Sequence, residues 1–179
     1  MIETLPGNAS VKLPVNPVLV LWRFSRPHTI IGSVFSITAL YILAGKGALS
    51  VSTVYFLTLL SALACNIFIV GLNQWVDVEL DKVNKPELPL AAGTLSKPQA
   101  RIILTVSLLV CLVVSALVSW FLLAMMVVIL LIGIAYSVPP VQLKKHHLPA
   151  ALSITLVRGF IVNLGMFIHF QREQFGSSF

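Results

Sequence analysis

The sequence predicts an all-α, polytopic bundle of about five transmembrane helices. Hydrophobic residues make up 58% of its 179 positions and charged residues only 10%, and the mean hydropathy is +0.97. This composition lies outside the range of soluble domains. A helix that crosses a bilayer needs about 20 apolar residues. Stretches of that kind lie at residues 27–45, 51–72, 101–119, 121–138 and 148–169. The lipid bilayer is therefore the expected surrounding of this chain.

Short connections that contain glycine or proline separate the predicted helices. They read "AGKG" at 44–47, "SKP" at 96–98 and "SVPPVQLKKHHLP" at 137–149. The proline pair in the last of these cannot continue a helix, because proline lacks the backbone N–H and clashes with the preceding turn. Residues 1–17 form a tail without the pattern of a secretory signal or transit peptide. We expect one membrane domain over residues 18–170 and a separate tail over 171–179.

The net charge of +6 is distributed unevenly between the two sides of the predicted bundle. The basic residues of one side precede the first helix or lie between helices two and three and between four and five: Lys12, Arg23, Arg26, Lys82, Lys85, Lys97, Arg101, Lys144 and Lys145. On the opposite side we expect only Lys46 and Arg172. Cytoplasmic loops carry the excess of Lys and Arg, so the N-terminus is expected on the cytoplasmic side. The charge thus indicates topology, and nucleic acid is not an expected partner.

Four oxygen-bearing side chains follow the second predicted helix on one face. At about 100° per residue, Asn73, Asp77, Asp81 and Asn84 fall within an arc of about 80°, whereas Glu79 points well away. Carboxylate and amide oxygens suit a hard divalent cation such as Mg²⁺, which often bridges to substrate phosphates. The basic residues nearby would then contact the phosphates directly. The stripe therefore predicts a Mg²⁺ site at the end of this helix.

Two other interpretations of the acidic stripe are open at this point. Acidic residues beside lysines at a helix end are often a solvated face with i,i+4 ion pairs. Asp77 and Asp81 would instead line a cation path if the chain were a small channel or transporter. Against the solvated face, Asn73 and Asp77 belong to a helix that is apolar on all sides, and polar groups at membrane depth generally face a cavity or a functional site.

The segment "NQWVDVELDKVNKPELPLAAGTLS" (73–96) resembles the first aspartate-rich motif of the UbiA superfamily of intramembrane prenyltransferases. Its residue pattern is similar to that of the homogentisate prenyltransferase branch. Glutamine is usual in that branch at the position of Gln74, where other branches carry aspartate. Three further segments agree: "WRFSRPHTIIG" (22–32), "AYSVPPVQLKKHHLPAAL" (135–152) and "VRGFIVNLGMFIHF" (157–170). The resemblance covers roughly residues 18–170 and implies part of a UbiA-type fold of nine helices.

The resemblance implies a chemistry for the stripe. In the family, the counterparts of Asn73, Asp77 and Asp81 are catalytic and hold Mg²⁺ bound to a prenyl diphosphate. Loss of pyrophosphate leaves an allylic cation, which an aromatic acceptor attacks. For this branch the resemblance implies a phytyl or similar donor and homogentisate as acceptor, in tocopherol or plastoquinone synthesis. Alternative acceptors are 4-hydroxybenzoate and chlorophyllide. A cyanobacterial-type inner or thylakoid membrane is the expected location.

Several other side chains are weaker candidates for substrate binding. Arg26, Lys85, Lys144 and Lys145 are expected either to contact diphosphate or to serve as topology signals only. Tyr136 and Ser137 either face the site or satisfy backbone groups freed at the proline pair. Arg158 lies mid-way along the last helix and is expected to meet an inward partner, which is a substrate carboxylate, a diphosphate or an acidic side chain.

The family generally carries a second aspartate-rich motif in a later helix connection, and this sequence contains only the first. The only acid after Phe170 is Glu173. We therefore expect residues 1–179 to be inactive alone, as part of a catalyst or as a non-catalytic remnant. His28 and His169 are expected at the membrane interfaces rather than as ligands, and Cys65 and Cys111 in core packing.

Overall fold

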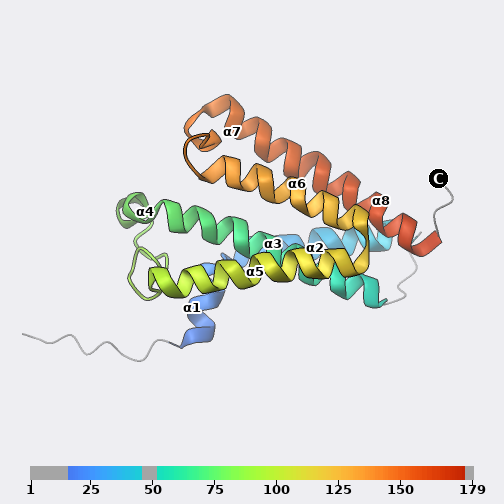
Figure 1. Ribbon diagram of the computed structural model, residues 1–179, viewed down its shortest axis with the longest axis horizontal. Coiled ribbons are helices and arrows are strands. Elements are labelled where there is room, and N and C mark those ends of the chain that lie inside the picture. Colours follow the sequence, from blue (N-terminus) through green and yellow to red (C-terminus); the bar gives the residue numbers. More distant parts are fainter. Residues whose placement is uncertain (1–15, 46–51, 176–179) are drawn as a thin grey trace, which may run out of the picture.

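The computed structural model describes residues 16–45 and 52–175 (Figure 1). Most of the tail 1–17, the first residue of the predicted span 51–72, and residues 176–179 of the tail 171–179 therefore lie outside the described residues. The helices run in the order α1 Pro17–Phe24, α2 Pro27–Ala44, α3 Thr53–Val76, α4 Val78–Asn84, α5 Lys97–Val118, α6 Trp120–Ser137, η1 Leu143–Lys145, α7 His147–Ile154, η2 Thr155–Ile161 and α8 Val162–Phe175. The all-α prediction is confirmed.

Five helical segments of the described residues are long and apolar enough to cross a membrane. They are α2, α3, α5, α6 and the continuous run His147–Glu173, which combines α7, η2 and most of α8. The predicted spans are confirmed to within a few residues at each end. Large apolar side chains face outward along these helices, as in Leu117 and Phe35, which are 75% and 72% exposed. These outward faces suit a hydrocarbon surrounding.

Local sequence explains where the helices begin. Ser52, Ser96 and Ser119 are the N-caps of α3, α5 and α6, and their hydroxyls accept hydrogen bonds from the backbone N–H groups of the first turn. At α5 the Gln99 side chain also accepts from the Ser96 backbone at 3.0 Å, which completes a capping box. These bonds satisfy backbone donors that a helix start leaves without partners.

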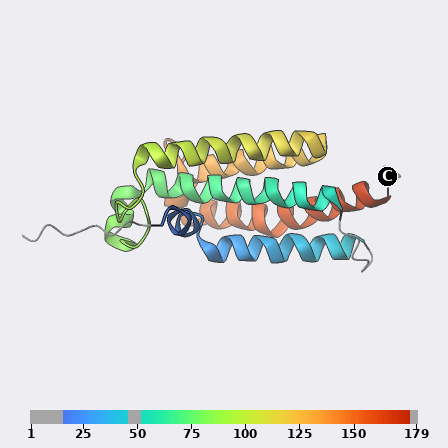
Figure 2. The same ribbon diagram turned by 90° about the horizontal axis from the view of Figure 1, so that it is seen from below.

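The bundle is organised around α3, which packs along α5 and also contacts α2 and α6, while α2 packs against α8. Figure 2 shows the long helices nearly side by side, with α4 and its following loop at one end. Where α3 meets α5, the Ser61 and Ser115 hydroxyls lie 2.6 Å apart and both donate to the Cys111 carbonyl. Such interhelical hydrogen bonds and small residues hold helices together where the hydrophobic effect is weak.

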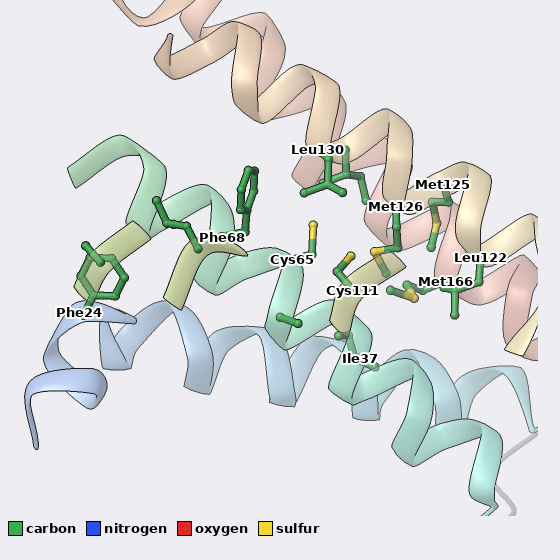
Figure 3. Close-up of a cluster of buried hydrophobic side chains, with 14 of the residues drawn as sticks. Phe24, Ile37, Cys65, Phe68, Cys111, Leu122, Met125, Met126, Leu130 and Met166 are labelled. Atoms are coloured by element: carbon green, nitrogen blue, oxygen red, sulfur yellow. The ribbon is translucent and has the colours of Figure 1, made fainter. Parts of the chain in front are cut away.

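The core is lined by sulfur-containing and branched side chains (Figure 3). Cys65 and Cys111 are free, buried thiols within it, as expected for core packing, together with Met126 and Met166. His169 is also buried, at 1% exposure, and its Nε2 lies 3.0 Å from the Thr58 hydroxyl. This hydrogen bond to α3 satisfies the ring inside the bundle, and the depth of His169 in the membrane stays a prediction.

Two features of the helices were not predicted. The short helix α1 precedes α2, and the two are separated by Arg26, whose φ of 53° lies in the left-handed region. The last span is not uniformly α-helical, because residues Thr155–Ile161 form a π-helix. A π-helical segment inside a longer helix changes which side chains face inward, and such segments occur often at functional sites.

Candidate active site

The helix that carries the acidic stripe bends at Asp77. Its backbone (φ −98°, ψ 17°) separates α3 from α4. The Asp77 N–H nevertheless donates to the Asn73 carbonyl at 3.0 Å, and the Asp81 N–H donates to the Asp77 carbonyl at 2.8 Å. The helical i to i−4 spacing is therefore kept across the bend, and Asn73, Asp77 and Asp81 remain on one side.

Lys144 reaches this side from a distant part of the chain. The proline pair ends α6 at Ser137, and the chain turns through η1, which holds Lys144. The Lys144 ammonium donates to the Asp77 carboxylate (Nζ to Oδ2, 2.5 Å) and to the Asn73 amide oxygen (Nζ to Oδ1, 3.1 Å). The Lys144 and Asp77 side chains are only 15% and 17% exposed. Two oxygen atoms of the stripe thus converge on one positive charge.

Asp81 is buried without a hydrogen-bond partner among the described residues. It is 6% exposed, and none of the ion pairs or hydrogen bonds of residues 16–45 and 52–175 involves its carboxylate. Burial raises the pKa of the Asp81 carboxyl above its ordinary value, while the charges of Lys85 and Arg26 oppose that rise.

Glu79 and Asn84, unlike the three residues just described, are exposed. Glu79 points away, as predicted, and forms an exposed ion pair with Lys82 (Oε2 to Nζ, 2.9 Å). This pair lowers the pKa of Glu79 below its ordinary value. Asn84 is the last residue of α4 and is exposed. Helical spacing keeps Asn84 on the side of Asp77 and Asp81, but at the exposed end of the stripe.

Arg26 and Lys85 line one cavity of about 680 Å³ at the junction between α1 and α2. Arg23 contributes a third positive charge to this lining, and Glu87 is its one acid. Arg26 also lines a second, deeper cavity. The structure therefore gathers Arg26, Lys85 and Lys144 around the stripe.

Two further cavities lie deeper in the bundle. The polar-end cavity, of about 390 Å³, has Arg26, Asn73, Tyr136, Ser137 and Arg158 in its lining. The mid-membrane cavity, of about 350 Å³, has His28, Asn66, Met126, Met166 and Arg158 in its lining. Figure 3 shows Met126 and Met166 among the core side chains. The remaining walls of both cavities are mostly apolar side chains of α2, α3, α6 and η2.

Tyr136 and Ser137 end α6 at the wall of the polar-end cavity. The Ser137 hydroxyl is fully buried, and it has no hydrogen-bond partner within the described part of the chain. It therefore does not satisfy a backbone group freed by the proline pair, which was the alternative interpretation. A buried hydroxyl without a partner costs free energy, and at a cavity wall it is available to a ligand.

Gln74, which stands where other branches of the family carry aspartate, has a structural role near the site. Its side chain is 1% exposed, and its amide Nε2 donates to the Phe24 carbonyl at 2.7 Å. This bond ties the end of α1 to α3 and so positions Arg26, which follows two residues later. An aspartate carboxylate cannot donate this hydrogen bond. The replacement of aspartate by an amide side chain at position 74 is the sequence feature that indicates this structural role.

The comparisons with known proteins agree with this architecture. Residues 33–178 match the model of the UbiA prenyltransferase family. The chain is 48% identical to a homogentisate phytyltransferase of Synechocystis sp. over 165 residues, covering 86% of this chain and 52% of that protein. It is 40% identical to a chloroplastic homogentisate solanesyltransferase of Arabidopsis thaliana over 164 residues, covering 88% of this chain and 42% of that protein. It thus spans about half the length of these relatives.

A solved structure of a digeranylgeranylglyceryl phosphate synthase has the same fold, with a TM-score of 0.74 at 18% sequence identity. The match covers 86% of this chain and 52% of that chain. The five spans, the acidic stripe at the α3–α4 bend and the family match over most of the sequence lead to one conclusion. This chain belongs to the UbiA prenyltransferase family.

Proposed function

We propose that this chain provides the Mg²⁺- and diphosphate-binding half of a prenyltransferase that transfers a prenyl group, phytyl in our proposal, to homogentisate. The observation that supports this most directly is the convergence of the Asn73 and Asp77 oxygens on one cation, the Lys144 ammonium. The buried Asp81 carboxylate lies one helical turn further along the same side. Family membership favours prenyl transfer over a cation path for these acids.

The residues present fit Mg²⁺ as a shared ligand of protein and substrate. The Asn73 and Asp77 side-chain oxygens already hold one cation, the Lys144 ammonium. The Asp81 carboxylate has no hydrogen-bond partner among the described residues and is available as a further ligand. None of the described residues forms a group of three or more His, Cys, Asp and Glu side chains suited to a metal ion. Mg²⁺ can bind with so few protein ligands, because it usually keeps several waters and takes oxygens from substrate phosphates. When bound, it would neutralise charge that develops on the pyrophosphate leaving group.

The chain's own basic residues supply the remaining charge. If a metal ion were bound by Asn73 and Asp77, the flexible Lys144 side chain would be free to contact the diphosphate. Arg26 and Lys85 line a common cavity, and their charges oppose the rise in the pKa of Asp81. Together they bind the leaving pyrophosphate through charge-assisted hydrogen bonds. The apolar walls of the two deeper cavities hold the prenyl chain and exclude water from the allylic carbon.

The choice of acceptor and donor rests on the relatives. The proteins from Synechocystis and Arabidopsis are both named for homogentisate, and their donors differ, phytyl in one and solanesyl in the other. Homogentisate is therefore the acceptor that we propose, and phytyl is proposed from the more similar of the two. A product assay that offers homogentisate, 4-hydroxybenzoate and chlorophyllide tests the acceptor. Preferential use of either of the last two would contradict it.

Binding of phytyl diphosphate to the chain in lipid nanodiscs tests the site. We expect binding that depends on Mg²⁺, and at least a tenfold loss for Asp77→Asn, on the order of one charge-assisted hydrogen bond. Lys144→Gln should weaken phytyl diphosphate binding but strengthen the binding of Mg²⁺ alone, because the competing ammonium is removed. Lys82→Gln is the matched control, since Lys82 pairs only with the exposed Glu79. Binding that is indifferent to Mg²⁺ and to Asp77→Asn would refute the proposal.

A further inference from the structure

We propose that Cys65 and Cys111 form a reversible oxidation site, at which a lipid-soluble para-quinone in the mid-membrane cavity converts the two thiols into a disulfide between α3 and α5. They are the two cysteines of the chain, and both are free and buried. The proposal requires neither the metal site nor prenyl transfer. It assigns a chemistry to two nucleophilic side chains that the proposed function leaves unused.

The register of α3 against α5 brings the two thiols together. The two helices run antiparallel (Figure 1), and the Ser61 and Ser115 hydroxyls lie 2.6 Å apart. Cys65 follows Ser61 by four residues along α3, and Cys111 precedes Ser115 by four residues along α5. In an antiparallel pair, both steps lead one turn in the same direction. The two cysteines therefore lie at one level, and their thiols are in hydrogen-bond contact.

The two helices also approach closely at this level, as a disulfide requires. The Cα atoms of a disulfide usually lie roughly 4.4–6.8 Å apart. The Ser61 hydroxyl of α3 donates to the backbone carbonyl of Cys111 at 3.1 Å. A side chain as short as serine reaches the backbone of another helix only where small residues let the two backbones come together. Figure 3 shows the two cysteine side chains, which are in contact, within the buried core.

Cys65 is the thiol of the pair that a small molecule can reach. It lines the mid-membrane cavity of about 350 Å³, together with apolar side chains such as Ile129 and Met166. This volume is within the range of small-molecule sites. Glutathione carries charges and does not enter apolar surroundings, whereas a quinone dissolves in lipid. The oxidant that suits this position is therefore an apolar acceptor of two electrons.

The reaction balances with one quinone as the only co-reactant. The Cys65 sulfur adds to a carbonyl carbon of the quinone, and the Cys111 sulfur then attacks the Cys65 sulfur. The S–S bond forms as the C–S bond breaks, and the electron pair of that bond passes into the ring. The two thiol protons go to the two ring oxygens, which gives a hydroquinone. Both products are neutral, so no net charge is left in the apolar core.

Ser61 assists the attacking sulfur. A thiolate attacks far faster than a thiol, so the Cys111 sulfur gains negative charge during the reaction. The Ser61 hydroxyl lies 3.9 Å from Cys111 Sγ and is a donor toward it. This donor distinguishes Cys111 from a thiol that is surrounded by hydrocarbon alone.

Oxidation by duroquinone (tetramethyl-para-benzoquinone) tests the proposal on the 179-residue chain in lipid nanodiscs. After exposure, the chain is denatured, treated with iodoacetamide and analysed by mass spectrometry. We expect wild-type chain to lose both alkylations, to yield one hydroquinone per chain, and to regain both alkylations after reduction with dithiothreitol. The melting temperature of the oxidised chain should rise, because a crosslink restricts the unfolded state.

A shifted cysteine is the matched control. Ser107 is buried on the same face of α5, one turn before Cys111. A chain with Cys111→Ser and Ser107→Cys keeps two thiols, but the second lies one turn, about 5.4 Å, away from the level of Cys65. Both thiols of this variant should stay free in duroquinone. Glutathione disulfide should leave both thiols of wild-type chain free, because it does not enter the cavity.

Wild-type chain that keeps both thiols free in duroquinone would overturn the proposal, as would disulfides that link two chains in place of the link within one chain. Equal oxidation of the shifted variant would show that the register of α3 and α5 does not decide the reaction. Equal oxidation by glutathione disulfide would show that the cavity is not the route. Either of these two results also contradicts the proposal.

Discussion

At the scale of the residue, the site is a balance between buried acids and the cations that reach them. Asp77 is neutralised by Lys144, whereas Asp81 is buried beside cations without contacting one. A buried carboxylate that lacks a hydrogen bond destabilises the fold unless it serves another purpose. The two neighbouring acids of the stripe therefore differ in their energetic roles in the free protein.

Asp81→Asn is expected to stabilise the chain at neutral pH in the absence of metal. Burial raises the pKa of Asp81, so the folded state binds the proton more readily than the unfolded state, and the charged form costs stability at pH 7. The melting temperature in nanodiscs should rise at pH 7. The gain should shrink as the pH falls through the raised pKa, because the wild-type carboxyl then becomes neutral.

Glu79→Gln serves as the control for that experiment, since Glu79 is exposed on the same short helix and pairs only with Lys82. Its melting temperature should match that of the wild-type chain, because exposed ion pairs contribute little. A lower melting temperature for Asp81→Asn at pH 7 would show that Asp81 stabilises the metal-free fold.

At the scale of the element, the close approach of α1 to α3 holds Arg26 in place. Gly71 lies where the Phe24 ring crosses α3, and Gln74 binds the Phe24 carbonyl one turn later. Helices approach this closely only where a side chain is absent. The sequence around Phe24 contains no signal for this contact, which depends on a residue more than 40 positions away.

Gly71→Ala should destabilise the chain by about 1–3 kcal/mol, as for overpacking of a core. The added Cβ would lie 2.6 Å from the Phe24 ring and 2.9 Å from Leu104, so α1 has to shift. Thermal denaturation in nanodiscs measures the effect. Gly32→Ala is the control, because a Cβ there meets no atom within 4 Å. Equal stability of the two variants would show that the contact between α1 and α3 contributes little to the free energy of unfolding.

At the scale of the whole molecule, the connections that carry the basic residues lie at one end of the bundle. The α3–α5 connection with α4 and the α6–α7 connection share this end in Figure 1. The predicted grouping of Lys85, Lys97 and Lys144 is thus present in the structure. Its assignment to the cytoplasmic side of the membrane stays a prediction, as does the inactivity of residues 1–179 alone.

Cysteine labelling tests the orientation. Lys97 is exposed at the start of α5, and Trp120 is 72% exposed at the start of α6, at the opposite end of α5. A membrane-impermeant maleimide should label Lys97→Cys in inverted vesicles and Trp120→Cys in right-side-out vesicles, because the positive end faces the cytoplasm. The native Cys65 and Cys111 are buried and should not react. The reverse labelling pattern would invert the topology.

Much of this protein follows from local patterns in its sequence. Hydropathy alone predicted the five spans, since a bilayer requires long apolar helices whatever their packing. Helical periodicity placed Asn73, Asp77 and Asp81 on one side, and this holds because the backbone hydrogen bonds continue across the bend at Asp77. No local pattern predicted the short helix α1 or the π-helix.

The tertiary structure decided what the stripe and the arginines do. Lys144 meets Asp77 only because the turn after the proline pair brings η1 against the α3–α4 bend, a contact between residues far apart in the chain. Arg158 lines two cavities whose walls combine residues of α2, α3, α6 and η2, which are far apart in the chain. Composition and periodicity act over a few residues, whereas these partners depend on how whole helices pack, so the sequence determined the helices and the fold determined the site.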